Sequence, residues 1–362
     1  MKVAIVHDWL VTNAGAEKVL KQIVEIYPHA DIFTLVDFLS DEQRAEILKG
    51  KKATTSFIQN LPFAKTHFRN YLPLFPKAIE SLGLSGYDLI ISSSWAVAKG
   101  VKKDQDALHV SYCHTPIRYA WDLYDEYTTN LKQPKKILVQ KSLQYIKKWD
   151  IESLDRVDYF IANSNFVKKR IKRIYNRDAI VIYPPIDIEK FSLHVNKDDY
   201  YLTASRLVPY KKTKLIVEAF NMMPKKKLVV IGAGEELDTI KAIAKSNITV
   251  LGYQEDAVLI NYMQRAKAFV YAAIEDFGIV PIEANACGTP VIALNKGGTA
   301  ETIQDGINGI HFQKQTEQSI VVAVMRFETL KFDFDTIRTT ALKYNNFKEN
   351  IRSYVESIWA KR

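Results

Sequence analysis

The sequence predicts an α/β protein with two doubly wound domains, each built on a parallel sheet that helices cover. Its 362 residues suit two domains at roughly 150 residues per domain. Short apolar runs alternate along the chain with longer segments of helical periodicity, a pattern typical of strands joined by crossover helices. The alternation occurs in two series, and the paired prolines Pro184 and Pro185 between them indicate a stiff connector.

The first series begins with a strand at 3–6, a small-residue turn at 12–15 and a helix whose apolar positions recur between 19 and 26. Further strands are expected at 88–91, 109–112 and 159–162. Polar residues follow these runs, with serines after the second, His114 after the third and Asn163 after the fourth. Because parallel strands end at the same edge of a sheet, we expect these polar side chains to share one edge.

The second series contains five expected strands, at 201–204, 228–231, 248–250, 268–271 and 291–294. We therefore place the first domain at 1–183, the linker at 184–198 and the second domain at 199–340. The last segment, 341–362, has helical periodicity and is expected to pack back on the first domain. Two such domains facing each other would leave a cleft between the carboxyl ends of their sheets, where folds of this class bind ligands.

Composition restricts the class of protein further. Hydrophobic residues make up 47% of the chain and charged residues 25%, which is typical of globular proteins and excludes a disordered chain. The two cysteines are far apart in sequence, so neither a disulfide nor a zinc site is expected. No apolar run is long enough for a membrane span and the start does not resemble a signal peptide, so we expect a cytoplasmic protein. The net charge of +9 favours anionic partners: phosphorylated metabolites, acidic lipid headgroups or nucleic acid.

The most informative segment is 275–290, which predicts a short helix. Pro281 suits the first helical position, Gly288 suits the C-terminal cap and Pro290 prevents continuation. Glu275 is then expected on the preceding loop and Glu283 in the first helical turn.

The start of this helix is a candidate phosphate site. The backbone N–H groups of Gly278, Ile279 and Val280 would point out of the helix start toward an anion. Two carboxylates beside a phosphate need hydroxyl groups to bind, which a sugar or a ribose supplies. A solvated acidic loop is the structural alternative.

A second candidate anion site follows the first strand of the second series. Arg206 offers a bidentate guanidinium and Lys211 a point charge, a combination that suits one diphosphate. Solvated cations at a helix start are the alternative interpretation.

Together these motifs resemble the large family of retaining GT-B glycosyltransferases, family four, over nearly the whole chain. The residues that carry the resemblance in the second domain are Glu275-x7-Glu283 with Phe277-Gly278, Gly288-Thr289-Pro290, Gly297-Gly298 and Glu301. In the first domain, the segment 14–17 resembles the family's glycine-rich loop. The segment Cys113–Tyr119 resembles the branch that contains O-antigen and exopolysaccharide mannosyltransferases, and Lys99-Gly100, Asn163-Ser164 and Tyr183-Pro184-Pro185 are similar to the same branch.

The resemblance implies a role for each matching residue of the second domain. Glu283 would hold the ribose hydroxyls and Glu275 would contact the transferred sugar. Arg206 and Lys211 would neutralise the leaving diphosphate without a metal ion or other cofactor. A departure from the family pattern is Ser205, where a glycine usually precedes the arginine.

Further donor contacts are implied from both domains. The backbone at Phe277, Gly278 and Ile279 would bind phosphate or sugar, and Tyr253 is a further donor-binding candidate. In the first domain, Gly15 would approach the diphosphate, although Ala14 replaces the usual first glycine of the pair. His114 would contact the donor sugar or the reaction centre, and a buried structural histidine is the alternative.

The implied activity is transfer of a hexose, mannose being favoured, from a nucleotide sugar to a growing, lipid-linked polysaccharide or O-antigen acceptor. GDP-mannose is favoured as donor only because the branch uses it. A nucleotide-sugar 2-epimerase of the same fold and a non-catalytic binder of anionic polymers are the alternatives. No nucleic-acid module is recognisable, so nucleic acid is not expected as a partner.

Two weaker motifs point elsewhere. Gly232-Ala233-Gly234 follows a strand, but position 237 is leucine, so a dinucleotide fingerprint is incomplete. Asp104-Gln105-Asp106 has the spacing of a metal-binding Asp-x-Asp motif, and a surface turn is the favoured interpretation.

Residues 51–79 contain basic and aromatic side chains with no Asp or Glu. This composition favours contact with the anionic inner face of the cytoplasmic membrane, where a lipid-linked acceptor would reside. A helix pair with solvated lysines covering the first sheet is the alternative.

Overall fold

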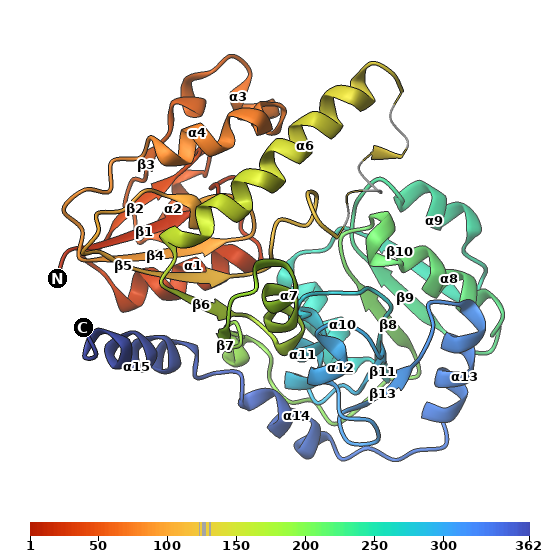
Figure 1. Ribbon diagram of the computed structural model, residues 1–362. Coiled ribbons are helices and arrows are strands. Elements are labelled where there is room, and N and C mark those ends of the chain that lie inside the picture. Colours follow the sequence, from red (N-terminus) through yellow and green to blue (C-terminus); the bar gives the residue numbers. More distant parts are fainter. Residues whose placement is uncertain (123, 125–127, 130–131) are drawn as a thin grey trace. The chain divides into compact units, whose positions relative to one another are not determined.

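The computed structural model describes residues 1–122, 124, 128–129 and 132–362. The chain divides into a first unit, formed by Met1–Pro185 and Asn346–Arg362, and a second unit, formed by Ile186–Asn345. Each unit contains one parallel sheet with helices packed on it (Figure 1). Both are Rossmann-like α/β folds, as the alternating pattern predicts.

Among the described residues, the first sheet has seven strands in the order β3-β2-β1-β4-β5-β6-β7, all neighbours being parallel. The strands are β1 (Val3–His7), β2 (Asp31–Thr34), β3 (Thr54–Thr55), β4 (Leu89–Ser94), β5 (Leu108–Cys113), β6 (Tyr159–Ala162) and β7 (Ala179–Val181). Ser92–Ser94 were expected to follow a strand. They lie inside β4 instead, because all three continue the pairing with β5. The α-helices are α1 (Gly15–Ile26), α2 (Asp41–Leu48), α3 (Ala64–His67), α4 (Phe75–Glu80), α6 (Lys135–Glu152), α7 (Asn165–Tyr175) and α15 (Phe347–Trp359).

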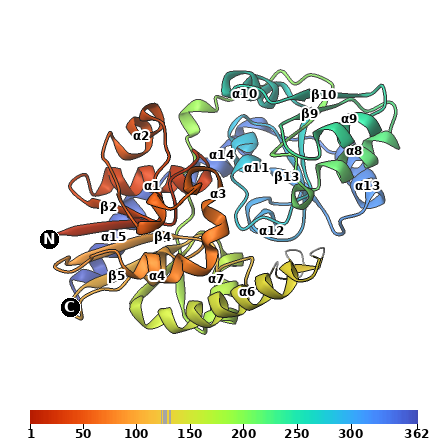
Figure 2. The same ribbon diagram turned by 90° about the horizontal axis from the view of Figure 1, so that it is seen from above.

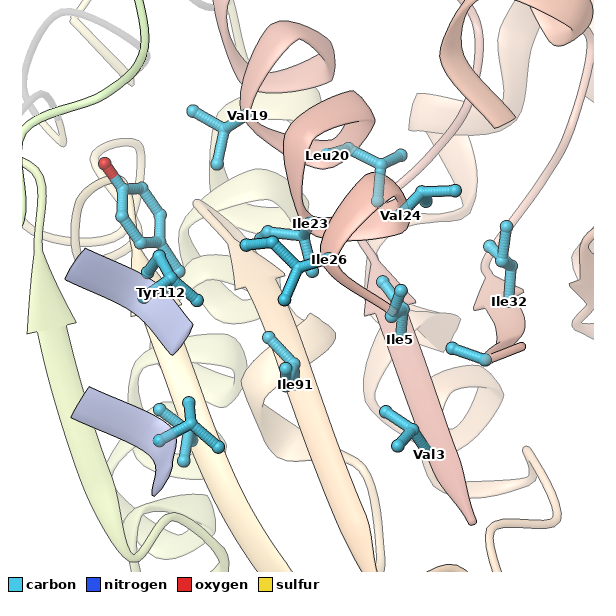
Figure 3. Packing of buried hydrophobic residues seen from close by; sticks show 14 of the residues in the cluster. Val3, Ile5, Val19, Leu20, Ile23, Val24, Ile26, Ile32, Ile91 and Tyr112 are labelled. Carbon is cyan, nitrogen blue, oxygen red and sulfur yellow. The ribbon is translucent and has the colours of Figure 1, made fainter. Parts of the chain in front are cut away.

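Helix α1 shows how the sequence builds this unit. Its apolar residues recur on one face and are buried, and Figure 3 shows Ile23 and Ile26 pointing from α1 toward Ile5 on β1 and Ile91 on β4. Strand β1 is buried along its whole length, as expected for a parallel strand covered on both faces.

The C-terminal helix α15 belongs to the first unit, where it packs beside α1 (Figures 1 and 2). Phe347 of α15 lies edge-on to Tyr112 of β5, with 5.6 Å between ring centroids. The stretch expected as one helical segment from 341 is in fact the end of α14 and a separate α15, because residues 343–346 interrupt the helix.

Six strands form the second sheet within the described residues, in the order β10-β9-β8-β11-β12-β13. The strands are β8 (Tyr201–Ala204), β9 (Leu228–Ile231), β10 (Ile248–Gly252), β11 (Ala268–Tyr271), β12 (Val291–Leu294) and β13 (Gly309–Phe312). The sequence predicts only the first five, since β13 contains a glycine and a histidine in four residues. The helices are α8 (Thr213–Asn221), α9 (Leu237–Ile243), α10 (Asp256–Arg265), α11 (Ile279–Ala286), α12 (Thr299–Thr302), α13 (Glu317–Phe327) and α14 (Phe334–Leu342).

Short 3₁₀ helices complete the two units, and two of them matter for the arguments below. One, η2 (Phe68–Leu74), lies within the basic and aromatic segment 51–79, and η6 (Pro209–Lys211) follows β8. The others are η1 (Phe57–Asn60), η3 (Ala98–Gly100), η4 (Ser153–Arg156) and η5 (Ile188–Lys190).

Candidate active site

The topology of the second sheet indicates where a ligand would bind. From β8 the chain proceeds to β9 and β10 on one side, and then returns to β11 on the other side of β8. In doubly wound sheets the crevice beyond the carboxyl ends at such a reversal is the usual ligand site. Lys211 follows β8 and Glu275 follows β11, so the two residues flank this reversal.

Lys211 and Glu275 form an ion pair there. The Lys211 Nζ lies 2.5 Å from Glu275 Oε1, and the two side chains are only 18% and 21% exposed. Tyr271, the last residue of β11, places its hydroxyl 3.5 Å from the same Nζ and hydrogen-bonds to Glu275. Burial and the adjacent Glu275 carboxylate raise the pKa of Tyr271 well above its usual value, so its hydroxyl stays protonated.

Arg206 has a different environment from Lys211. Its guanidinium is exposed, and Nη2 donates to the Tyr210 hydroxyl at 2.8 Å. The centre of the Tyr210 ring also lies 5.5 Å from Lys211 Nζ and 5.9 Å from the guanidinium carbon of Arg206, so both cations lie near the same ring. The structure therefore pairs Lys211 with Glu275, whereas Arg206 is exposed and hydrogen-bonds to Tyr210.

The start of α11 differs in register from the sequence prediction. Gly278 is the N-cap with φ 85°, and the helix begins at Ile279. Pro281 is consequently the third helical residue instead of the first, and Glu283 lies in the second turn. The prediction was wrong by two residues because the positive φ of Gly278 lets the chain enter the helix earlier. The backbone N–H groups in the first turn still lack intrahelical acceptors, as at every helix start.

Two glycines after β12 hold the loop that carries Glu275. The Gly298 N–H donates to the Glu275 carbonyl oxygen at 2.8 Å. A Cβ at Gly298 would lie 2.1 Å from the Phe277 carbonyl oxygen, and one at Gly297 would lie 2.5 Å from that of Glu275. Phe277 itself is buried against Tyr344, so only its backbone is available to a ligand.

The remaining donor-binding candidates of the second unit differ in exposure. Glu283 is buried on α11, with 6% of its surface exposed. Tyr253 is 73% exposed and follows β10, which is the edge strand and is separated from β8 by β9. At about 4.8 Å per strand, the strand that Tyr253 follows lies roughly two strand spacings from β8.

In the first unit the reversal lies between β1 and β4, because β1 neighbours both β2 and β4. Gly15 begins α1 in the connection that leaves β1. Ala14, the departure from the family's glycine pair, has the extended conformation φ −128°, which any residue adopts, and its N–H donates to Glu17 Oε2 at 3.0 Å.

His114 follows β5 on the same edge of this sheet. Its Nε2 is 2.8 Å from the Ser93 hydroxyl, and its backbone N–H donates to the Ser94 carbonyl oxygen. The Trp95 ring packs on it at 5.6 Å between centroids. Burial, and to a smaller extent the neighbouring His7, lower the pKa of His114 to about 3, so its imidazole is neutral near pH 7.

Two family models match this chain, and together they extend over most of it. The model described as Glycosyltransferase Family 4 matches residues 15–190, and the model described as Glycosyl transferases group 1 matches residues 185–353. The chain belongs to this glycosyltransferase family.

Curated relatives of this glycosyltransferase include mannosyltransferases. The alpha-1,3/1,6-mannosyltransferase ALG2 of Saccharomyces cerevisiae is 25% identical over an alignment of 253 residues, and the match covers 55% of this chain and 48% of the relative. A GDP-mannose-dependent monoacylated alpha-(1-6)-phosphatidylinositol monomannoside mannosyltransferase of Corynebacterium glutamicum is 34% identical over 114 residues, 27% of this chain and 30% of the relative. Each match covers less than half of the relative's own length.

Solved structures resemble the whole chain. HepE from Anabaena in complex with UDP has a TM-score of 0.69 at 18% identity and covers 99% of this chain and 100% of its own. Sucrose-phosphate synthase from Thermosynechococcus elongatus has a TM-score of 0.70 at 15% identity, with 100% of both chains covered. Two parallel-sheet Rossmann-like units with these neighbours confirm the predicted GT-B fold class.

Sequence reasoning missed several residues that contact the candidate residues within each unit. Tyr271 and Tyr210 contact Lys211, and Ser93 and Trp95 contact His114. Ser93, Trp95 and Tyr271 lie at or just beyond strand ends, and Tyr210 directly precedes Lys211, which are the signals that could have found them. Lys99 and Gly100, part of the family resemblance, are structural: Lys99 forms a buried ion pair with Asp150 at 2.8 Å.

Proposed function

We propose that this glycosyltransferase moves a hexose, mannose being favoured, from a nucleoside-diphosphate donor to a growing, lipid-linked saccharide acceptor. The observation that carries the proposal is the Lys211–Glu275 pair beside the start of α11, at the reversal of the second sheet. Mannosyltransferases among the relatives support mannose as the sugar, and one of these relatives is GDP-mannose-dependent.

In this proposal the second unit binds the donor. Lys211 and Arg206 meet the diphosphate, the amides at Phe277–Ile279 bind phosphate or sugar oxygens, and Glu283 accepts the ribose hydroxyls. As the sugar–phosphate bond breaks, negative charge grows on the leaving oxygen, and these fixed cations and amide dipoles stabilise it. They supply the charge that a metal ion would otherwise provide, so we propose metal-independent transfer.

Glu275 orients the transferred sugar in this proposal. Its carboxylate already accepts from Lys211 and Tyr271, which leaves it a fixed acceptor for a sugar hydroxyl. We assign it no covalent step. The acceptor oxygen attacks from the face that the phosphate leaves, the departing phosphate takes the acceptor's proton, and the anomeric configuration is retained. In the first unit the neutral imidazole of His114 contacts the sugar or the reaction centre, and Gly15 approaches the diphosphate.

A thermal-shift screen of GDP, UDP and ADP tests the donor. A ligand that binds only the native state raises the free energy of unfolding, by about 2.7 kcal/mol at a hundredfold excess over Kd, and the melting temperature rises as a result. We expect GDP to give the largest shift, and no shift with any nucleoside diphosphate would contradict the proposal.

A product assay then tests the reaction class. We expect nucleoside diphosphate release that depends on added acceptor and a product with the donor's anomeric configuration. Release without acceptor together with an epimerised sugar would indicate the 2-epimerase, and salt-sensitive binding of random DNA without turnover would indicate a polymer binder.

Contact with an anionic membrane is the second part of the proposal. No helix within the described ranges is long and apolar enough to cross a membrane. The segment 51–79 instead exposes Phe63 at 80%, beside exposed Lys65 and other basic residues. Helix α6 packs against η2 of this segment and adds Leu138, exposed at 67%. Apolar side chains beside lysines suit the interface of an anionic bilayer.

Co-sedimentation with phosphatidylglycerol vesicles tests this contact. We expect binding at low salt that Phe63→Ser with Lys65→Glu reduces at least fivefold. Lys241→Glu serves as control, because Lys241 is an exposed lysine of the second unit and its replacement changes the net charge by the same amount as Lys65→Glu. No binding at low salt would refute the membrane contact.

A further inference from the structure

Asp8 bridges the two strands at the reversal of the first sheet. It directly follows β1, and its carboxylate accepts four backbone N–H groups from the segment after β4. Oδ2 accepts from Trp95 at 2.6 Å and Ala96 at 2.9 Å, and Oδ1 accepts from Val97 and Ala98, both at 2.7 Å. Asp8 has no exposed surface. Each oxygen therefore holds two amides, and none of the carboxylate is available to a substrate.

The loop that Asp8 holds carries the aromatic contact of His114. Trp95 lies 5.6 Å from the His114 ring and 4.9 Å from the His7 ring, both in edge-on geometry. Ser93, two residues before Trp95, binds His114 Nε2 at 2.8 Å. The end of β4 and its following loop thus contact His114 at two points, one through a hydroxyl and one through an indole.

A carboxylate is well matched to this task. Four converging N–H dipoles need an acceptor with two oxygens and no proton, and charge-assisted bonds of this kind are shorter and stronger than neutral ones. In Asp8→Asn one oxygen becomes an NH₂ group, which cannot accept the two amides that point at it. The loop from Trp95 would then have to move, although the side chain has nearly the same volume.

We infer that Asp8 is a positioning residue for His114: its carboxylate fixes the Trp95–Ala98 loop across the sheet reversal and thereby fixes the ring of His114. The inference rests on the proposed function only where it links the position of the His114 ring to the rate of sugar transfer. A displacement of about 1 Å in a reacting group can cost a hundredfold in rate. Binding of the nucleoside diphosphate should not depend on Asp8, because we assign it to the second unit and to Gly15, and the Asp8 carboxylate holds neither of them.

A double-mutant cycle and an NMR measurement on the full chain test the inference. The first compares turnover of wild type, Asp8→Asn, His114→Ala and the double variant. We expect Asp8→Asn to lower kcat tenfold to a hundredfold, with the Kd of the nucleoside diphosphate changed less than twofold. In the His114→Ala background the same substitution should cost less than threefold. An equal loss in both backgrounds, or a kcat within twofold of wild type, would overturn the inference.

The second measurement does not need activity. The imidazole resonances of His114, assigned by their absence in His114→Ala, should shift in Asp8→Asn. They should stay unchanged in Asp158→Asn, a control at a first-unit carboxylate that also accepts a backbone N–H, that of His109 at 2.7 Å, near the start of β5 and so at the opposite end of that strand from His114. Unchanged His114 resonances in Asp8→Asn would overturn the inference. If Asp8→Asn does not fold, Trp95→Leu replaces it. We then expect the same shift of the His114 resonances and a loss of kcat that again becomes smaller in the His114→Ala background. A wild type that transfers no sugar while the resonances shift would refute the proposed function and support the positioning role.

Discussion

Replacing Lys211 by alanine is the sharpest test of the proposed donor site. The variant removes the ammonium group that lies 2.5 Å from Glu275 and next to the start of α11. We expect kcat to fall by two to three orders of magnitude, because the substitution deletes a fixed cation from the place where the leaving phosphate gains charge.

The magnitude follows from the position of the side chain. Lys211 is 18% exposed, so water screens its charge only in part. Two unit charges about 4 Å apart interact by about 4 kcal/mol at an effective dielectric constant near 20. Only the share of this interaction energy that develops as the sugar–phosphate bond breaks lowers the barrier. A share of about 3 kcal/mol corresponds to roughly two orders of magnitude in rate.

The assay is the initial rate of nucleoside diphosphate release at saturating donor and acceptor. Lys212→Ala is the matched control, because Lys212 is the next residue, carries the same charge and is exposed. We expect the control to retain at least half of the wild-type rate. A folded Lys211→Ala enzyme with kcat within threefold of wild type would show that this lysine does not stabilise the leaving group.

Three further predictions concern other parts of the protein. Glu275→Ala should lower turnover by two or more orders of magnitude in the same assay while nucleoside diphosphate still binds, and near-normal turnover would remove Glu275 from the site. Gly298→Ala should weaken donor binding at least tenfold in a titration, because its Cβ would meet the Phe277 carbonyl oxygen at 2.1 Å; unchanged affinity would contradict the packing argument. Burial lowers the pKa of His109 from 6.5 to about 4. Between these two pH values the unfolded state therefore binds a proton that the native state does not bind. The free energy of unfolding should therefore decrease between pH 6.5 and 4 by about 3 kcal/mol from this group, at about 1.4 kcal/mol per pKa unit, and chemical denaturation of His109→Asn should show a flatter pH profile.

The cores of both sheets and the loop that carries Glu275 could be predicted from the sequence because their signals are local. Continuous apolar runs such as Val3–Val6 and Leu228–Ile231 identify strands buried on both faces, and both are strands in the structure. The short strands β2, β3, β7 and β13 were missed. Two threonines in β3, and a glycine and a histidine in β13, do not produce such a run, and β2 and β7 have only four and three residues. The register of α11 was missed because no local pattern records the positive φ of Gly278, the residue after which the helix begins.

By itself the sequence determined the two-series α/β pattern, the loop that carries Glu275 and the glycines that a close backbone approach requires. Only the tertiary structure decided that Lys211 meets Glu275, 64 residues later, and that Asp8 holds amides 87 to 90 residues away. The physical reason is that these contacts depend on which strands become neighbours. Neighbouring strands are selected by burial of the helices and strands together, and no local spacing in the chain records that choice.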